Sequence, residues 1–170
     1  GYNYSYILNP FINGSLSPLE FVNHIVSSYR REYGNVHSDY TQSAVELRNF
    51  DKIEENMRHL GMLLSDIIGK NESFFRIVRT VRSSKTYTTE FADPDFIDLC
   101  FFYKSLLKRV YGVSEEGLMF ANIRDELATL RVILESGIEV LSSLIVQNAS
   151  GINMQNSHGL SVYFPQRSIH

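Results

Sequence analysis

The chain has 170 residues, of which 44% are hydrophobic and 21% are charged, and its formal net charge is −3. This is the composition of an ordinary globular protein, and it excludes disordered, collagen-like and coiled-coil chains. The slight negative charge gives no general attraction to nucleic acid, and no apolar run approaches the ~20 residues that a membrane span needs. The single cysteine excludes an internal disulfide framework and a multi-cysteine metal site.

The first half of the chain predicts an irregular start and then helices. Residues 2–17, rich in Tyr, Asn, Ser and Gly, are expected to form an irregular lead-in without a signal peptide. A helix then begins at Ser17, where Pro18 takes the first turn and Glu20 completes a capping box, and it ends at Gly34. Residues 43–47 are a short strand candidate, and apolar residues at helical spacing predict helices at 50–68 and 72–84.

The second half predicts two more helices and two more strands. The Asp93-Pro94 pair is expected to begin a helix that ends at Gly112, and another runs over residues 114–141, with Gly137 as a point of bending or interruption. Residues 143–147 indicate a strand. In the closing run, Leu160, Val162 and Phe164 alternate with polar positions and Pro165 ends the strand.

The expected fold is therefore α/β but predominantly helical, with about five helices and three short strands. So few strands do not make a stable sheet by themselves. We expect them to complete a larger sheet whose other strands lie outside this sequence.

Four segments of the chain follow a common family pattern. Residues 1–8 are an aromatic, Gly-led segment, residues 41–47 read Thr-Gln-Ser-Ala-Val-Glu-Leu, and residues 96–99 read Phe-Ile-Asp-Leu. Residues 159–165 read Gly-Leu-Ser-Val-Tyr-Phe-Pro, which is the most specific block. In this order the segments resemble the clostripain family of cysteine peptidases, downstream of the catalytic cysteine. Glu46 stands where that family more often has Asp.

The resemblance implies a fragment of a caspase-like α/β fold. Residues 1–48 would end the catalytic α/β region, residues 49–142 would form a helical C-terminal subdomain, and residues 143–170 would return as closing strands. It also implies a bacterial, secreted endopeptidase, extracellular or periplasmic, that cleaves proteins or peptides after Arg or Lys. Its catalytic Cys–His dyad would lie before Gly1, so the partner of this chain would be the N-terminal catalytic half of the same protein.

The thiol and imidazole groups in this chain are weak candidates for catalysis. Cys100 lies inside a helical pattern among aromatic residues, where a cysteine acts as a small core hydrophobe. The His158-Gly159 pair precedes its strand, whereas the catalytic His-Gly of the resembled family follows one. The spacing of the remaining histidines in the sequence does not allow any two of them to share a metal ion; these are His24, His37, His59 and His170. We therefore assign no catalytic residue and no metal ligand.

Two charged clusters are also better explained by structure than by a ligand. Asp93, Asp95 and Asp98 are expected to cap a helix; calcium, which some members of the resembled family require, has no assignable site here. Arg76, Arg79, Arg82 and Lys85 repeat every third residue and predict a solvated basic face on one helix. The chain requires no cofactor on this interpretation.

The sequence and the resemblance leave two alternative functions. The first is the C-terminal part of a clostripain-like cysteine endopeptidase, which supports a dyad located upstream. The second is a non-catalytic binding or interaction domain that uses an exposed sheet edge or helical face. Residues that contact substrate remain unassigned, although Tyr2 and Tyr4 are nearest to the expected specificity loop.

Overall fold

The computed structural model describes residues 3–14, 16–113 and 117–166, and these are mostly helical with two small antiparallel sheets of two strands each. Two compact units are present. The small unit comprises residues 1–46 and 145–159, and the helical unit comprises residues 47–144 and 160–170. Within the described residues, no helix is both long enough and apolar enough to cross a membrane.

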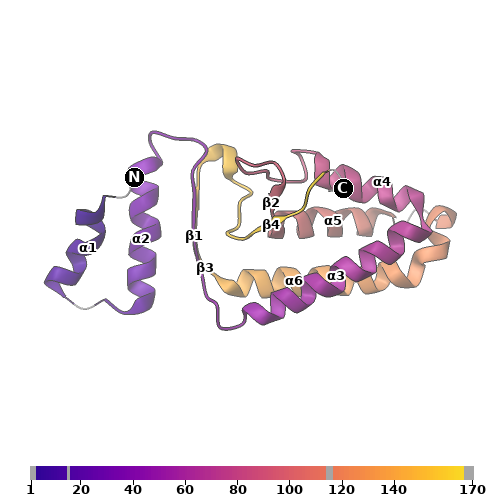
Figure 1. The fold of residues 1–170 in the computed structure, drawn as a ribbon, viewed down its shortest axis with the longest axis horizontal. Coiled ribbons are helices and arrows are strands. Elements are labelled where there is room, and N and C mark those ends of the chain that lie inside the picture. Colours follow the sequence, from indigo (N-terminus) through magenta and orange to yellow (C-terminus); the bar gives the residue numbers. More distant parts are fainter. Residues whose placement is uncertain (1–2, 15, 114–116, 167–170) are drawn as a thin grey trace. The chain divides into compact units, whose positions relative to one another are not determined.

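The small unit is a helix pair beside a two-stranded ribbon (Figure 1). It contains α1 (Tyr4–Asn13), α2 (Pro18–Tyr33), β1 (Thr41–Val45), β3 (Ile145–Ser150) and the short 3₁₀ helix η2 (Ile152–Met154). The two strands pair antiparallel from Thr41 opposite Ser150 to Val45 opposite Ile145. The apolar side of α2 packs on the ribbon, where Val26, Tyr40 and Ala149 form a small core.

The start of α2 confirms the capping box. The Ser17 hydroxyl accepts a hydrogen bond from the Glu20 N–H, and the Glu20 carboxylate accepts one from the Ser17 N–H. The prediction of an irregular lead-in is wrong, because residues 4–13 form α1. The Asn3 side chain caps this helix by accepting a hydrogen bond from the Tyr6 N–H at 3.2 Å. Packing on α2 adds to it: Ile7 is buried, and the ring of Phe11 meets that of Phe21 edge-on at 4.5 Å.

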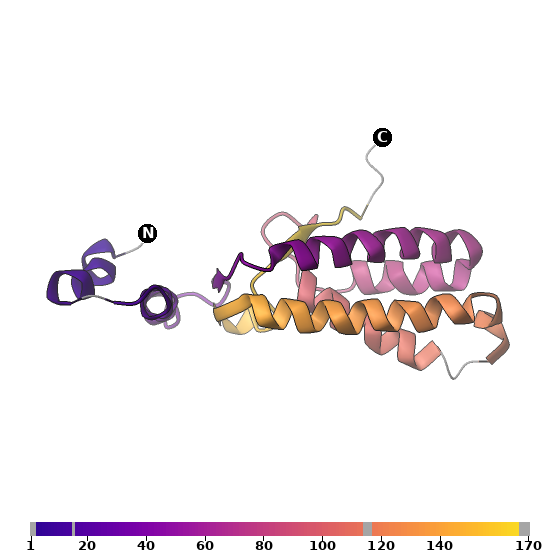
Figure 2. The same cartoon turned by 90° about the horizontal axis from the view of Figure 1, so that it is seen from below.

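The helical unit is built on four long helices. These are α3 (Phe50–Lys70), α4 (Glu72–Ser83), α5 (Leu99–Val113) and α6 (Arg124–Leu144), and the 3₁₀ helix η1 (Gly117–Ile123) precedes the last. Both α3 and α5 pack against α4 and α6, and Figure 2 shows α3 and α6 running lengthwise beside each other. Their apolar stripes meet in a core that includes Ile67, Phe74, Leu106 and Leu130, all of them fully buried.

A second ribbon lies at the N-terminal end of α5. It consists of β2 (Phe96–Asp98) and β4 (Ser161–Tyr163), which pair antiparallel with Ile97 opposite Val162. The prediction of a helix start at Asp93 is therefore wrong: residues 96–98 are extended, and α5 begins at Leu99. The Asp98 carboxylate is the group that caps this helix, since it accepts a hydrogen bond from the Phe101 N–H at 2.8 Å.

The remaining differences from the predicted elements are local. The first strand lies two residues earlier than expected, and residues 143–144 belong to α6 rather than to β3. The helix expected over 114–141 is 3₁₀ up to Ile123, and residues 114–116 lie outside the described part. Gly137 lies in an unbroken stretch of α6. Every strand of the described chain pairs with another strand of the same chain, and a larger caspase-like sheet stays a prediction.

Candidate functional site

Cys100 is a core residue. It lies in the first turn of α5 and is 5% exposed. A helix N-terminus would favour a thiolate, but here burial raises the pKa of the thiol, and the nearby Lys104 ammonium opposes this only in part. The group is therefore a protonated thiol at neutral pH rather than a nucleophile.

The histidines are held in separate local contacts. The His158 Nδ1 lies 2.6 Å from the Asn156 carbonyl oxygen, and His24 Nε2 lies 3.2 Å from that of Tyr6. His37 packs its ring against Tyr33 and His59 contacts Arg58, whereas His170 and Tyr2 lie outside the described residues. In the described part of the chain, no three His, Cys, Asp or Glu side chains are grouped so that they could hold a metal ion.

The glycine of the His158-Gly159 pair has a backbone role. Its φ of +107° lies in the region that side chains rarely adopt, and a Cβ there would lie 2.8 Å from Ile145 Cδ1. The backbone conformation at this position therefore favours glycine. Tyr4, near the expected specificity loop, lies on α1 and is exposed.

The predicted carboxylate cluster divides into three separate roles. The Asp93 carboxylate accepts a hydrogen bond from the Asp95 N–H at 2.9 Å, and that of Asp95 accepts one from the Gln166 N–H at 3.4 Å. Asp98 is fully buried and caps α5. These contacts fix the loop before β2 and the segment after β4.

The predicted basic face on α4 is wrong at Arg82, which is 4% exposed. Its Nη2 donates to the Pro94 carbonyl at 2.8 Å, its Nε donates to the Phe164 carbonyl, and its Nη1 lies 3.4 Å from Glu90 Oε1. The Gln166 amide also donates to Glu90. We call Arg82, Glu90 and their carbonyl partners the Arg82 latch, because together they fasten the segment that follows β4.

A signal for this burial was present in the sequence. Arg82 follows Phe74 and Val78 at four-residue steps, so it extends the apolar stripe of α4 rather than the polar face. By contrast, Arg76 is exposed and pairs with Glu72 one turn away, Arg79 is exposed, and Lys85 lies beyond the end of the helix.

In the described part of the chain, β4 pairs with a strand along one edge only. On one side of β2, the Asp98 N–H bonds to Thr89 and the Phe91 N–H bonds to Phe96. On the other side lies β4, tied at its ends by hydrogen bonds from Leu99 to Leu160 and from Phe164 to Asp95. Within the described residues, no strand pairs with the outer edge of β4. An open edge of this kind can accept a further strand.

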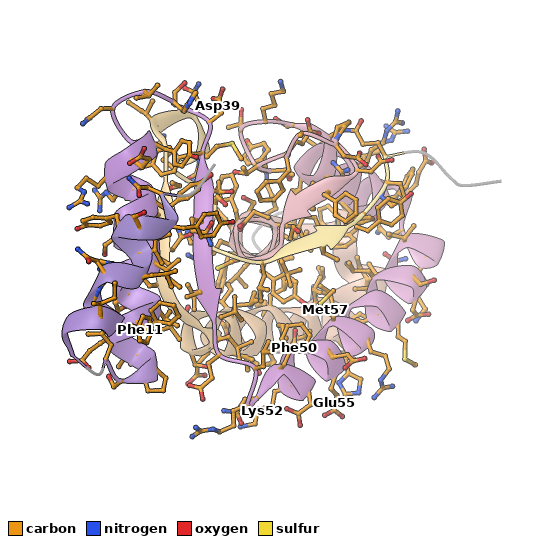
Figure 3. The ribbon with its side chains drawn as sticks, turned by 60° about the vertical axis from the view of Figure 1, so that its left-hand side comes forward. Phe11, Asp39, Phe50, Lys52, Glu55 and Met57 are labelled. Atoms are coloured by element: carbon orange, nitrogen blue, oxygen red, sulfur yellow. The ribbon has the colours of Figure 1, made fainter. Side chains whose placement is uncertain are left out.

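A mostly apolar hollow of about 520 Å³ lies between α3 and β4. We call it the β4 hollow; its lining residues are Phe50, Ile53, Glu54, Met57, Arg58, Leu99, Leu160 and Ser161. Figure 3 shows Phe50 and Met57 on the side of α3 that faces β4, with Lys52 and Glu55 on the outer side. Apolar side chains of an added strand could enter this hollow while its backbone pairs with β4.

No protein-family model, curated protein or solved structure matches this chain. The assignment of a function therefore depends on the sequence pattern and on the geometry of this surface.

Proposed function

We propose that this chain is the C-terminal part of a clostripain-like cysteine endopeptidase that cleaves after Arg or Lys, and that it supports a Cys–His dyad carried by an upstream part of the same protein. The observation that carries the proposal is the pairing of two segments of the family pattern. The closing block at residues 159–165 contains β4, and it pairs with β2 from the block at residues 96–99.

The state of the thiol supports a non-catalytic role for this part. Cys100 is the only cysteine of the chain, and it is a buried residue whose pKa is raised by desolvation. A dyad peptidase needs an accessible thiolate beside an imidazole. On this proposal both groups come from the upstream part.

The supporting contact would be made at the free edge of β4 and the β4 hollow. A strand of the catalytic part would pair with β4, and its apolar side chains would enter between α3 and β4. Such a contact fixes the geometry of loops that follow the strands, and a misplacement of ~1 Å in a catalytic group can cost about 100-fold in rate. Export of the protein would follow from the same family pattern, whereas calcium, which some members of the family require, has no assigned site in this chain.

A non-catalytic binding domain is the second candidate, since the same free edge would accept a strand from a separate partner. The coding sequence upstream of this chain distinguishes between the two candidate functions. We expect it to encode, upstream of this chain, one strand followed by His-Gly and another followed by Cys. A frame without these blocks would favour the binding domain.

The complete protein provides the biochemical test. We expect it to hydrolyse arginyl and lysyl amide substrates, and we expect Cys100→Ala to retain that activity because the thiol is a core group. Replacement of the upstream cysteine should abolish activity. Inactivity of the folded complete protein, or loss of activity in a folded Cys100→Ala variant, would contradict the proposal.

A further inference from the structure

A second hollow, of about 310 Å³, lies between α4 and the C-terminal half of α5. Its lining residues are Ile77, Tyr87, Lys108, Arg109, Gly112 and Val113. It shares none of them with the β4 hollow, so the function proposed above leaves it unused. Its volume is at the lower end of the range for small-ligand sites, which is roughly 300–1,000 Å³.

The Arg109 guanidinium is held at this hollow by a neutral partner. Its Nη2 donates a hydrogen bond to the Tyr87 hydroxyl, and its central carbon lies 4.5 Å from the centroid of the Tyr87 ring. Both contacts orient the guanidinium but leave its charge uncompensated. Since one hydroxyl occupies only part of its donor set, further N–H groups remain for a ligand.

Lys108 adds a second positive charge to the same hollow. Its side chain is exposed, and within the described residues it has neither an ion pair nor a hydrogen bond. No carboxylate is among the described lining residues, and α5 itself contains no Asp or Glu. The two cations are therefore not neutralised by their own helix.

The partial negative charge at the C-terminal end of α5 opposes these two positive charges, but it is smaller than either. Val113 ends α5, and the C-terminal end of a helix carries the equivalent of roughly −0.5 charge. Among the described lining residues, two full positive charges outweigh this partial negative charge. The side chains of Ile77 and Val113 supply apolar contact beside the charged groups.

We propose that this hollow binds a small organic anion, whose oxyanion group contacts Arg109 and Lys108 and whose apolar part packs on Ile77, Val113 and the Tyr87 ring. A guanidinium fork recognises a planar pair of oxyanion oxygens, and an ammonium adds a point charge. Phosphate and carboxylate share this chemistry. The proposal is independent of the peptidase function.

Calorimetric titration of the 170-residue chain with phenyl phosphate, benzoate and inorganic phosphate is the test. We expect phenyl phosphate or benzoate to bind with a Kd below about 1 mM. Inorganic phosphate should bind more weakly because it lacks the apolar part. The stronger of the two organic ligands identifies the oxyanion.

Three substitutions probe the lining and one serves as a matched control. Arg109→Gln and Lys108→Gln should each weaken binding about 10-fold or more, as expected for the loss of a charge-assisted contact. Tyr87→Phe should weaken it a few-fold, because it frees the guanidinium from its orienting hydroxyl. Arg79→Gln, an exposed cation on α4 that is not among the lining residues, should change the Kd less than about 2-fold. Thermal unfolding checks that each variant is folded.

Three results would overturn the proposal. Absence of binding by the folded chain is the first, and an equal loss in Arg79→Gln and Arg109→Gln, which would indicate general charge attraction, is the second. The third concerns Glu115 and Glu116, which follow α5 in the sequence. If only a Glu115→Gln, Glu116→Gln double variant binds the anion, those carboxylates already neutralise the two cations.

Discussion

The guanidinium of Arg82 lies in the interior of the helical unit with two carbonyl oxygens and one carboxylate around it. A buried charge is tolerated only where its donors are satisfied, and this one fastens two segments far apart in the sequence, those around Pro94 and Phe164. Phe164 also packs its ring edge-on against Phe102, so the latch and the core hold the same residue.

Loss of the Arg82 side chain should be costly. We expect Arg82→Ala to lower the free energy of unfolding by about 3–5 kcal/mol, because it removes the donor of two carbonyl groups and the ion-pair partner of Glu90. Arg76→Ala is the matched control on the same helix: its ion pair with Glu72 is exposed, and its removal should cost less than about 0.5 kcal/mol. Denaturant unfolding of both variants measures the difference, and equal costs would contradict the latch.

The long helices of the helical unit approach closely where their side chains are small. A Cβ on Gly137 would lie 2.2 Å from Tyr103 Cε2 and 2.6 Å from Asn56 Oδ1, so α6 needs glycine where α3 and α5 meet it. The Tyr103 hydroxyl donates to the Asn56 side chain at 3.0 Å, and the Asn56 amide donates to the Ile133 carbonyl of α6. These bonds cross all three helices.

Two glycine substitutions distinguish the effect of helix propensity on stability from the effect of packing. Gly61→Ala in α3 places its Cβ where nothing lies within 4 Å, and it should raise the free energy of unfolding by about 0.5–1 kcal/mol. Gly137→Ala gains the same propensity but must displace Tyr103 and Asn56, and it should lower the free energy by about 1–3 kcal/mol. Thermal or denaturant unfolding gives both values. Stabilisation by both substitutions would contradict the close approach.

Most of the buried side chains named above belong to the helical unit, and two of them titrate at alkaline pH. Burial raises the pKa of Cys100 above its ordinary value of 9.0 and that of Tyr103 well above its ordinary value of 10.0. The folded state therefore binds these two protons more tightly than the unfolded state does. Their contribution to stability is complete below the ordinary values and is lost as the pH rises through the raised ones.

The free energy of unfolding should therefore decrease as the pH rises above about 9. Urea unfolding between pH 7 and pH 11 measures this slope. Tyr103→Phe should make it shallower, because the variant removes the group with the larger shift, whereas Tyr163→Phe serves as a control on an exposed tyrosine. If the free energy of unfolding of Tyr103→Phe falls with pH as steeply as that of the unchanged chain, Tyr103 does not contribute to the pH dependence.

Local patterns in the amino-acid sequence were enough to predict the helices that carry their own signals. Ser17, Pro18 and Glu20 define the start of α2 through local hydrogen bonds, and the apolar stripe from Ile53 to Ile67 defines α3, because capping and periodicity involve residues at most a few positions apart. The burial of Cys100 followed from its aromatic neighbours for the same reason.

Which distant segments of the chain contact one another became clear from the folded structure alone. The partners of β1 and β2, the packing of residues 4–13 on α2 and the carbonyl partners of Arg82 all depend on residues ten or more positions away. So do the two hollows, each of which is lined by more than one element. Local patterns carry no information about such contacts, since their free energy is gained only when distant segments pack together and exclude water.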